Sequence, residues 1–192
     1  MIQTKEDLRY YISRDRARYN VSTKRLLLGW FLHGEAYQAI RYLKALRYCE
    51  YYTNNKKKGF YYKLMATYYR LKMKRLGNIY RIKIDLNLCA PGVRLVHLNG
   101  GIRMAGKSIG ENLTISTGCL IGRNGKKLPT VGNNVELCVG AKIIGEINVG
   151  NNVIVAPNSV VIKDVPDNCI VSGVPAIIIK RMEPKEDNHS TK

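Results

Sequence analysis

The sequence has no long apolar run, no paired cysteines and few histidines, and each absence excludes a class of protein. The longest apolar stretch, Leu26 to Leu32, is far too short to span a bilayer, and the charged N-terminus has no apolar signal core. The five cysteines are scattered without a CxxC pair, which favours reduced, buried thiols in a cytoplasmic protein. His97 is the only histidine within residues 84–179, whereas a hydratase-type metal site would need three, so no metal is expected.

Acidic residues are also scarce, and the excess of positive charge is uneven. The chain has 32 Lys and Arg against 14 Asp and Glu, a net charge of +18. Residues 1–84 hold 20 of the basic and 5 of the acidic residues, a net of +15, and residues 85–192 a net of +3. All 13 tyrosines precede residue 81, and all 6 prolines follow residue 90. Two architectures therefore meet near residues 76–84.

The first 80 residues are predicted to form a basic, Tyr-rich helical domain. Apolar spacing predicts helices over residues 1–30, 34–53 and 60–76, with a turn at 54–59 and Gly77 just after the last helix. Three interpretations of the charge stay open. The helices could simply be solvated with tyrosines packed between them, they could attract an anionic glycan, lipid-linked substrate or membrane, or they could bind nucleic acid. No groove-reading motif accompanies the charge, which disfavours nucleic acid.

A period of six residues runs through the second half of the chain. An aliphatic residue returns at the second place of nearly every block between residues 108 and 165, as in SIGENL, TISTGC, TVGNNV and KIIGEI. Such hexads are the signature of a parallel β-helix, in which Gly and Asn at the corners accept a left-handed backbone cheaply. We expect this domain to span residues 81–179, with a polar loop at 123–129 and a charged, flexible tail at 180–192.

The hexads resemble a known family. The runs CAPGVRLVHLNGGIRMAGKSIGENLTISTGCLIG and VGAKIIGEINVGNNVIVAPNSVVIKDVPDNCIVSGVPA are similar to those of the hexapeptide-repeat acyltransferases, in the serine acetyltransferase branch and its relatives from surface-polysaccharide clusters. The resemblance implies a mainly β fold with α, a left-handed parallel β-helix preceded by a small helical domain. It also implies a homotrimer with sites between subunits and acetyl-CoA as the donor.

The same resemblance assigns the chemistry to a histidine. His97 aligns with the family's catalytic base, which takes a proton from the acceptor hydroxyl. Asp85, the only acidic residue between Glu50 and Glu111, is a candidate to orient that base, or else it caps the junction between the domains. Thr117 is expected to stack above His97 and either bind substrate or serve as a corner hydroxyl. His33 and His189 are interpreted as structural or solvated.

Donor binding is likewise implied by the resemblance. Small residues would let the pantetheine arm lie along the coils, and basic residues would meet the nucleotide phosphates. The expected donor-binding residues are Gly122, Gly140, Ala141, Ala156, Lys163, Gly173, Pro175 and Lys180.

Departures from the serine enzymes influence the choice of acceptor. The aspartate that usually precedes the catalytic histidine is Val96 here, and the Arg-His-Pro segment of the family's protruding loop corresponds to residues 127–129, Lys-Leu-Pro. These departures favour an O-acetyltransferase acting on a sugar hydroxyl in polysaccharide assembly, with serine O-acetylation for cysteine synthesis as the alternative. A non-catalytic scaffold is a further possibility. A nucleotidyltransferase is excluded because the first half lacks strands and a Gly-rich phosphate loop.

Overall fold

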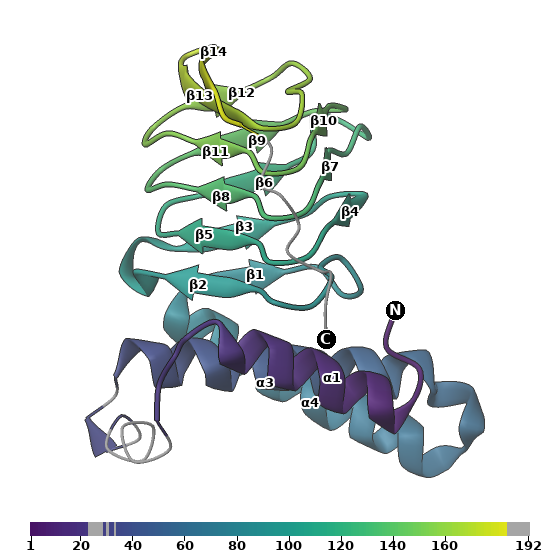
Figure 1. Cartoon of the computed structure of the whole chain (residues 1–192). Helices are drawn as coiled ribbons and strands as arrows, with labels where there is room; N and C mark the ends of the chain where they lie inside the picture. Colours follow the sequence, from purple (N-terminus) through teal and green to yellow (C-terminus); the bar gives the residue numbers. More distant parts are fainter. Residues whose placement is uncertain (23–28, 30, 33, 184–192) are drawn as a thin grey trace, which may run out of the picture.

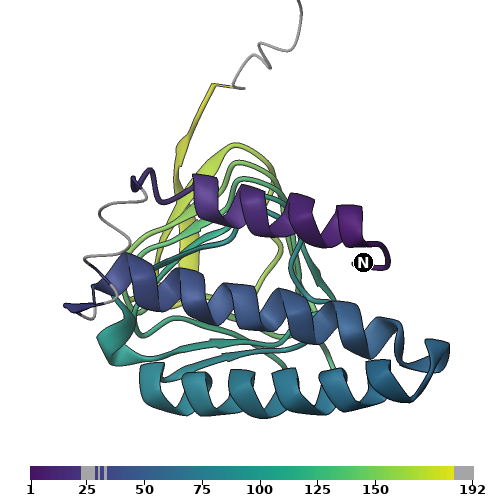
Figure 2. The ribbon, with the colours of Figure 1, turned by 90° about the horizontal axis from the view of Figure 1, so that it is seen from below.

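The protein is a triangular β-solenoid standing on a layer of helices (Figure 1). The structure, a computed structural model, describes residues 1–22, 29, 31–32 and 34–183. In these ranges the helical layer consists of three α-helices, α1 (Lys5–Ala17), α3 (Glu35–Asn54) and α4 (Phe60–Tyr80), and a short 3-10 helix, η1 (Lys56–Lys58). Figure 2 shows the three α-helices side by side across the end of the solenoid, with α3 in the middle. The expected combination of a β-helix and a small helical part is confirmed.

The solenoid has three parallel faces, which we call A, B and C in the order in which the chain visits them. Face A contains β1 (Ile82–Ile84), β3 (Ile102–Met104), β6 (Leu120–Gly122), β9 (Lys142–Ile144) and β12 (Val160–Val161). Face B contains β4 (Ser108–Ile109), β7 (Thr130–Val131) and β10 (Asn148–Val149). Face C contains β2 (Arg94–Val96), β5 (Thr114–Ser116), β8 (Glu136–Leu137), β11 (Ile154–Val155) and β13 (Cys169–Gly173). We name the edge from C to A edge 1, from A to B edge 2, and from B to C edge 3.

The aliphatic columns predicted from the hexads fill the solenoid. Ile115 pairs with Leu137, which pairs with Val155 and so on up face C, and each of these three side chains is fully buried. The corners also behave as predicted, because Asn134 and Asn152 on edge 3 both have a φ of 54°. Their amides form a ladder, in which each side chain donates to the asparagine oxygen of the next coil. The asparagine side chains at this corner thus satisfy one another's hydrogen bonds, while the aliphatic residues face inward.

A buried charged cluster joins the helices to the first coil. Arg47 of α3 is 0% exposed, and its guanidinium donates to Asp15 of α1 at 2.8 Å and to Glu50 at 3.1 Å. It also donates to the carbonyl oxygens of Cys89 and Ala90 in the first coil. Burial raises the pKa of Glu50, although the neighbouring Arg47 opposes that shift. One guanidinium therefore ties two helices to the solenoid.

Three boundaries differ from the sequence-based predictions. The first helix ends at Ala17 instead of continuing to residue 30, and residues 23–28 and 30, with His33 and His189, lie outside the described residues. Gly77 does not end α4, because the helix runs on to Tyr80 and is capped by Arg81 in the left-handed conformation. Gly77 is needed instead for close packing, since a Cβ there would lie 2.5 Å from the carbonyl oxygen of Ile82.

The tail also begins later than predicted. Residues 176–181 form β14 (Ala176–Arg181), which pairs antiparallel with β13. Lys180 therefore pairs with Ile170 in a strand and is not part of a flexible tail. In Figure 2 this last strand extends outward beyond the triangular outline.

Candidate active site

His97 lies on edge 1, at the corner that follows β2. Its backbone has a φ of 55°, and a single 3-10 turn, η2 (Leu98–Gly100), follows before the chain enters face A. The side chain is 65% exposed. The sequence spacing explains why this corner is unusual, because nine positions separate the inward residues Leu95 and Met104 where a hexad has six. The extra residues carry the imidazole out of the coil.

A carboxylate from the helical layer faces this imidazole. Glu35, the first residue of α3, places its Oε2 3.7 Å from the Nδ1 of His97. Its Oε1 accepts a hydrogen bond from the backbone N–H of Leu98 at 3.2 Å. Glu35 thus contacts both the histidine side chain and the turn that follows it. Sequence reasoning missed this residue, which precedes His97 by 62 positions.

Asp85 is not brought to His97 within one chain. It follows β1, so it lies on edge 2, at the opposite end of face A from His97. Its backbone N–H donates to Met104, and the carboxylate is exposed. A spacing of 12 residues amounts to two faces of a three-faced coil, and only residues about 18 apart share an edge. The spacing alone therefore predicts that Asp85 and His97 of one chain lie on different edges.

Thr117 lies one coil above His97, as predicted. The pairing of Val96 with Ser116 places the two residues at successive levels of edge 1. The hydroxyl oxygen of Thr117 accepts a hydrogen bond of 2.6 Å from the backbone N–H of Gly100. Thr117 therefore holds the turn that follows His97, while its hydroxyl proton is still available to donate.

The donor-binding candidates divide between edges. Gly140, Ala141 and Ala156 lie on edge 1 in the coils above His97, and Gly173 ends β13 at that same edge. Gly122 is the last residue of β6 and Lys163 follows β12, so both lie on edge 2.

Two further candidates belong to the terminal hairpin. Pro175 lies in the exposed turn between β13 and β14 after a cis peptide bond, and Lys180 pairs with the start of β13, away from edge 1. The structure therefore gathers four of the eight donor-binding candidates on the edge that carries His97.

The backbone N–H groups of the three small residues on edge 1 already have partners. Gly140 donates to the carbonyl of Thr117 at 2.9 Å, Ala141 donates to Cys138, and Ala156 donates to Val171. A ligand amide lying along this edge would have to use the second lone pair of a carbonyl oxygen. The small side chains nevertheless leave room for a thin ligand against the coil.

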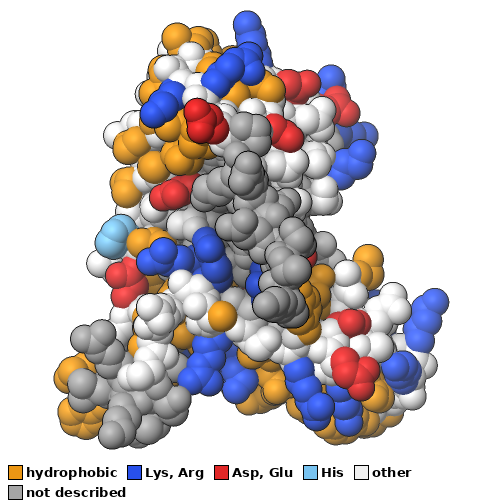
Figure 3. Space-filling view, viewed as in Figure 1, with side chains coloured by type: hydrophobic (Ala, Val, Ile, Leu, Met, Phe, Trp, Pro, Cys, Tyr) orange, Lys and Arg blue, Asp and Glu red, His pale blue; other side chains and the backbone are white. Residues whose placement is uncertain are grey.

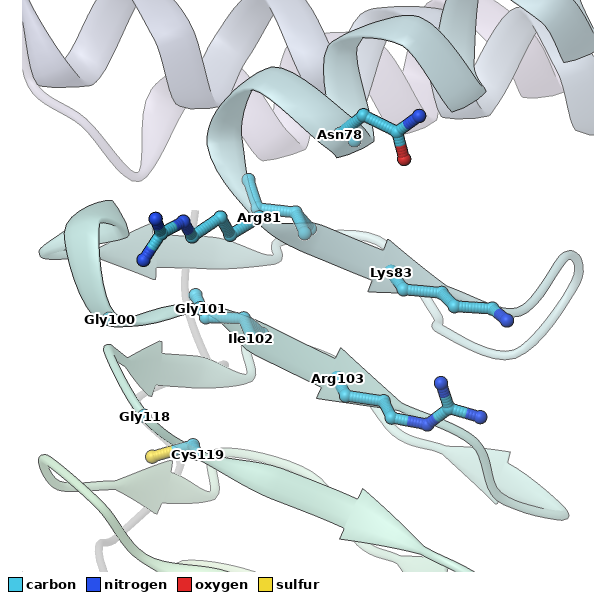
Figure 4. A pocket seen from close by; sticks show the side chains of 11 residues that line it. Asn78, Arg81, Lys83, Gly100, Gly101, Ile102, Arg103, Gly118 and Cys119 are labelled. Carbon is cyan, nitrogen blue, oxygen red and sulfur yellow. The ribbon is translucent and has the colours of Figure 1, made fainter.

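A cationic cleft opens beside the same edge. It has a volume of about 480 Å³ and lies where α4, the start of face A and the turn after His97 meet. Figure 4 shows Lys83 and Arg103 projecting from β1 and β3, and Arg81 projecting the other way from the junction of α4 and β1, with Gly100 and Gly101 at one end. None of the residues that line the cleft is acidic. The lining residues are Gly77, Asn78, Arg81, Ile82, Lys83, Gly100, Gly101, Ile102, Arg103, Gly118 and Cys119.

The thiol beside the cleft is not activated. Burial raises the pKa of the Cys119 thiol, whose Sγ donates to the carbonyl of Cys138 at 2.9 Å. Within the described part of the chain, no three His, Cys, Asp or Glu residues gather closely enough to hold a metal ion. Nor does any helix in those ranges combine the length and the apolar character needed to cross a bilayer. The site thus consists of His97, Glu35, a cationic cleft and an edge of small residues.

Comparisons with known proteins lead to one group of enzymes. No family model matches the chain. A serine acetyltransferase from Synechococcus elongatus is 38% identical over 104 residues, which covers 47% of this chain and 41% of that protein. The chain thus spans about two fifths of the length of this curated relative.

Solved structures agree on the fold. The serine acetyltransferase of Neisseria gonorrhoeae superposes with a TM-score of 0.67 at 22% identity, covering 94% of this chain and 69% of the other. A serine acetyltransferase solved in complex with CoA superposes with a TM-score of 0.64 at 23% identity, covering 91% and 71%. Over part of its sequence and over most of its fold, the chain is similar to serine acetyltransferases, and it has the same left-handed hexapeptide-repeat solenoid with a helical part before it.

Proposed function

We propose that this protein is an acetyl-CoA-dependent O-acetyltransferase whose acceptor is L-serine. The observation that carries the proposal is the exposed imidazole of His97 facing the Glu35 carboxylate, on an edge lined with small residues. The sequence relatives are named serine acetyltransferase, and a structural neighbour was solved with CoA. The relatives give no support to a sugar acceptor, although Val96 and the Lys-Leu-Pro segment at 127–129 favour one. Serine O-acetylation, its alternative, is therefore preferred.

The reaction needs a base because an alcohol is a poor nucleophile near neutral pH. In the proposed mechanism His97 accepts the hydroxyl proton as the alcohol oxygen bonds to the thioester carbonyl carbon. The carbon–sulfur bond then breaks, and the departing thiolate takes up the proton from His97. Glu35 is assigned the positioning role, because its 3.7 Å approach to Nδ1 orients the ring and favours the transient imidazolium.

The cationic cleft supplies a reason for an amino acid as acceptor. Serine carries a carboxylate, and Arg81, Lys83 and Arg103 line the cleft, whose described lining contains no acidic residue. A carboxylate held there would place the rest of a small acceptor beside the turn that contains Gly100. A neutral sugar would leave these cations without a partner.

Donor binding is proposed along edge 1. Gly140, Ala141 and Ala156 would lie under the pantetheine arm, with Gly173 and Pro175 near the nucleotide end. Lys180 and Lys163 remain the candidates for the phosphates, both exposed but not on edge 1.

A homotrimer would explain why candidates divide between two edges. Asp85, Gly122 and Lys163 on edge 2 can meet His97 on edge 1 only if the two edges come from neighbouring copies. Such a head-to-tail contact is heterologous and closes into a ring when three prisms pack side by side. We therefore propose that each site takes edge 1 from one copy and edge 2 from the next.

The test of the proposed reaction is thiol release from acetyl-CoA with L-serine as acceptor. His97→Ala and His97→Asn should lower kcat by about 10² to 10⁴ while both keep the melting temperature of the parent protein. Turnover with a sugar but not with serine would refute the assignment of L-serine as the acceptor. Undiminished turnover by His97→Ala would refute the assignment of His97 as the catalytic base.

Two further variants test how the site works. Arg103→Glu should raise the KM for serine but not that for acetyl-CoA, whereas Lys107→Glu, exposed outside the cleft, should change neither. Glu35→Gln should lower kcat with little change in the KM for acetyl-CoA. If Glu35 only stabilised the fold, the melting temperature would fall while kcat stayed constant.

The trimer is tested by mixing subunits. Light scattering should give three times the chain mass of 21.8 kDa. Co-expressed His97→Ala and Asp85→Ala chains, each inactive alone, should regain about one quarter of the activity, because one site in four then combines two intact edges. Full activity of the Asp85→Ala homo-oligomer would remove Asp85 from the site, and a monomer would refute the assembly.

A further inference from the structure

The outward face of α4 carries large apolar side chains that nothing in the described chain covers. Phe60, Leu64, Tyr68, Leu71 and Ile79 are between 52% and 80% exposed. At 3.6 residues per turn, these positions fall within an arc of about 100° on the helix. The buried residues Ala66, Leu76, Gly77 and Tyr80 lie on the opposite side and pack toward α3 and the solenoid. The helix therefore has two apolar faces, and among the described residues only one of these faces has a partner.

Cations border the exposed ridge on both sides. Lys63, Arg70 and Lys74 follow one flank of α4, Lys72 lies on the other, and Arg75 lies within the ridge itself. The three lysines of η1 are exposed just before the helix begins. No acidic residue occurs anywhere between Glu50 and Asp85. Figure 3 shows Lys and Arg side chains interspersed with hydrophobic ones along the lower side of the helical layer.

A hollow lies within this face. It has a volume of about 610 Å³ and is lined by Tyr68, Leu71, Leu76 and Ile79 together with Arg41, Lys72 and Arg75. Apolar walls beside three cations suit a molecule that joins hydrocarbon to a negative charge. An anionic phospholipid has that combination, with acyl chains next to a phosphate.

We infer that the α4 face docks on an anionic membrane surface. The positive charge around the ridge favours a membrane over the two alternatives, a second copy of the chain and a nucleic acid. A second copy meeting the same face would bring like cations together. The ridge has aromatic rings at Phe60 and Tyr68, but no motif that reads base edges accompanies them, which disfavours a nucleic acid. An amphipathic helix with apolar residues flanked by Lys and Arg binds in the interfacial layer of a bilayer, held by apolar burial and by attraction to anionic lipids.

The inference is tested by flotation of the full chain with vesicles. Protein should float with phosphatidylcholine vesicles that contain one quarter phosphatidylglycerol, and not with phosphatidylcholine alone. Binding should weaken as salt is raised. Equal flotation on both vesicles, or on neither, would overturn the inference.

Variants locate the surface. Leu64→Glu/Leu71→Glu should abolish flotation, whereas Ile177→Glu, which is slightly more exposed at 67% and lies on β14, should leave it intact. Replacing Lys63, Arg70 and Lys74 with Gln should lower partition by about fivefold per cation, on the order of 100-fold in all. A circular dichroism spectrum equal to the parent's shows that each variant is folded.

Three outcomes oppose the inference. Loss of flotation by Ile177→Glu to the same degree would show that the α4 face is not the contact. Concentration-dependent self-association that Leu71→Glu abolishes would assign the face to a second copy. Tighter binding to an RNA than to the vesicles would assign it to nucleic acid. Thiol release from acetyl-CoA should be unaffected by these variants, which separates this inference from the proposed reaction.

Discussion

Replacing Arg47 with methionine should be the most destabilising single change at the junction of helices and solenoid. Methionine fills a similar length but removes five hydrogen bonds, two to Asp15, one to Glu50 and one each to the carbonyls of Cys89 and Ala90. It also leaves two buried carboxylates without their cation. Removing one partner of a buried ion pair costs about 3–5 kcal/mol. For a chain of this size that corresponds to a fall in melting temperature of roughly 6–20 °C.

The measurement is thermal unfolding followed by circular dichroism at one fixed protein concentration. A matched control is Lys127→Met, which breaks the exposed pair with Glu146 at 3.3 Å and should cost less than about 1 kcal/mol. Adding Glu50→Gln to Arg47→Met should restore about 0.5–3 kcal/mol, because a buried charge is then removed. An Arg47→Met protein as stable as the Lys127→Met control would refute the assignment of Arg47 as the tie between the two parts.

Three other predictions concern the fold. Gly77→Ala should lower stability by about 1–3 kcal/mol in a thermal melt, because a Cβ would lie 2.5 Å from the Ile82 carbonyl oxygen, and an unchanged melting temperature would contradict this packing. Burial raises the pKa of Cys89 to about 12, so this thiol should resist iodoacetamide at neutral pH until the protein is unfolded, as mass spectrometry can show. Backbone N–H groups of Thr4 and Gln3 lower the pKa of Asp7, so the stability it gives α1 is present above its ordinary value of 3.8 and is lost as the pH falls below it. Hydrogen exchange in α1 should show that loss in the parent and not in Asp7→Asn.

The solenoid was predictable because its period is strict. A hexad with an aliphatic residue at one place fixes which side chain turns inward, and Gly or Asn at the corner fixes where the chain bends, as Asn134 and Asn152 illustrate. Thr117 was placed correctly for the same reason, since register along one chain is a matter of counting. Such local rules also predicted α3 to within one residue at each end.

What could not be predicted depends on contacts between distant segments. Glu35 reaches His97 only because α3 packs under the first coil, and no local pattern marks its carboxylate as special. Gly77 has the usual signature of a helix end, yet the helix continues because its glycine admits the backbone of β1. Likewise β14 lies after the hexads end and forms only because it pairs with β13. Nothing in the local sequence of residues 180–181 predicts that pairing.

The bulged turn that carries His97 has a consequence for how this protein can change. Leu95 and Met104 keep their places in the inner columns although nine positions separate them, so the turn between them is outside the periodic ladder. Residues could be gained or lost there without moving any coil above or below. Evolution can therefore vary the length of this one segment, and with it the shape of the space beside the imidazole, while the rest of the architecture stays constant.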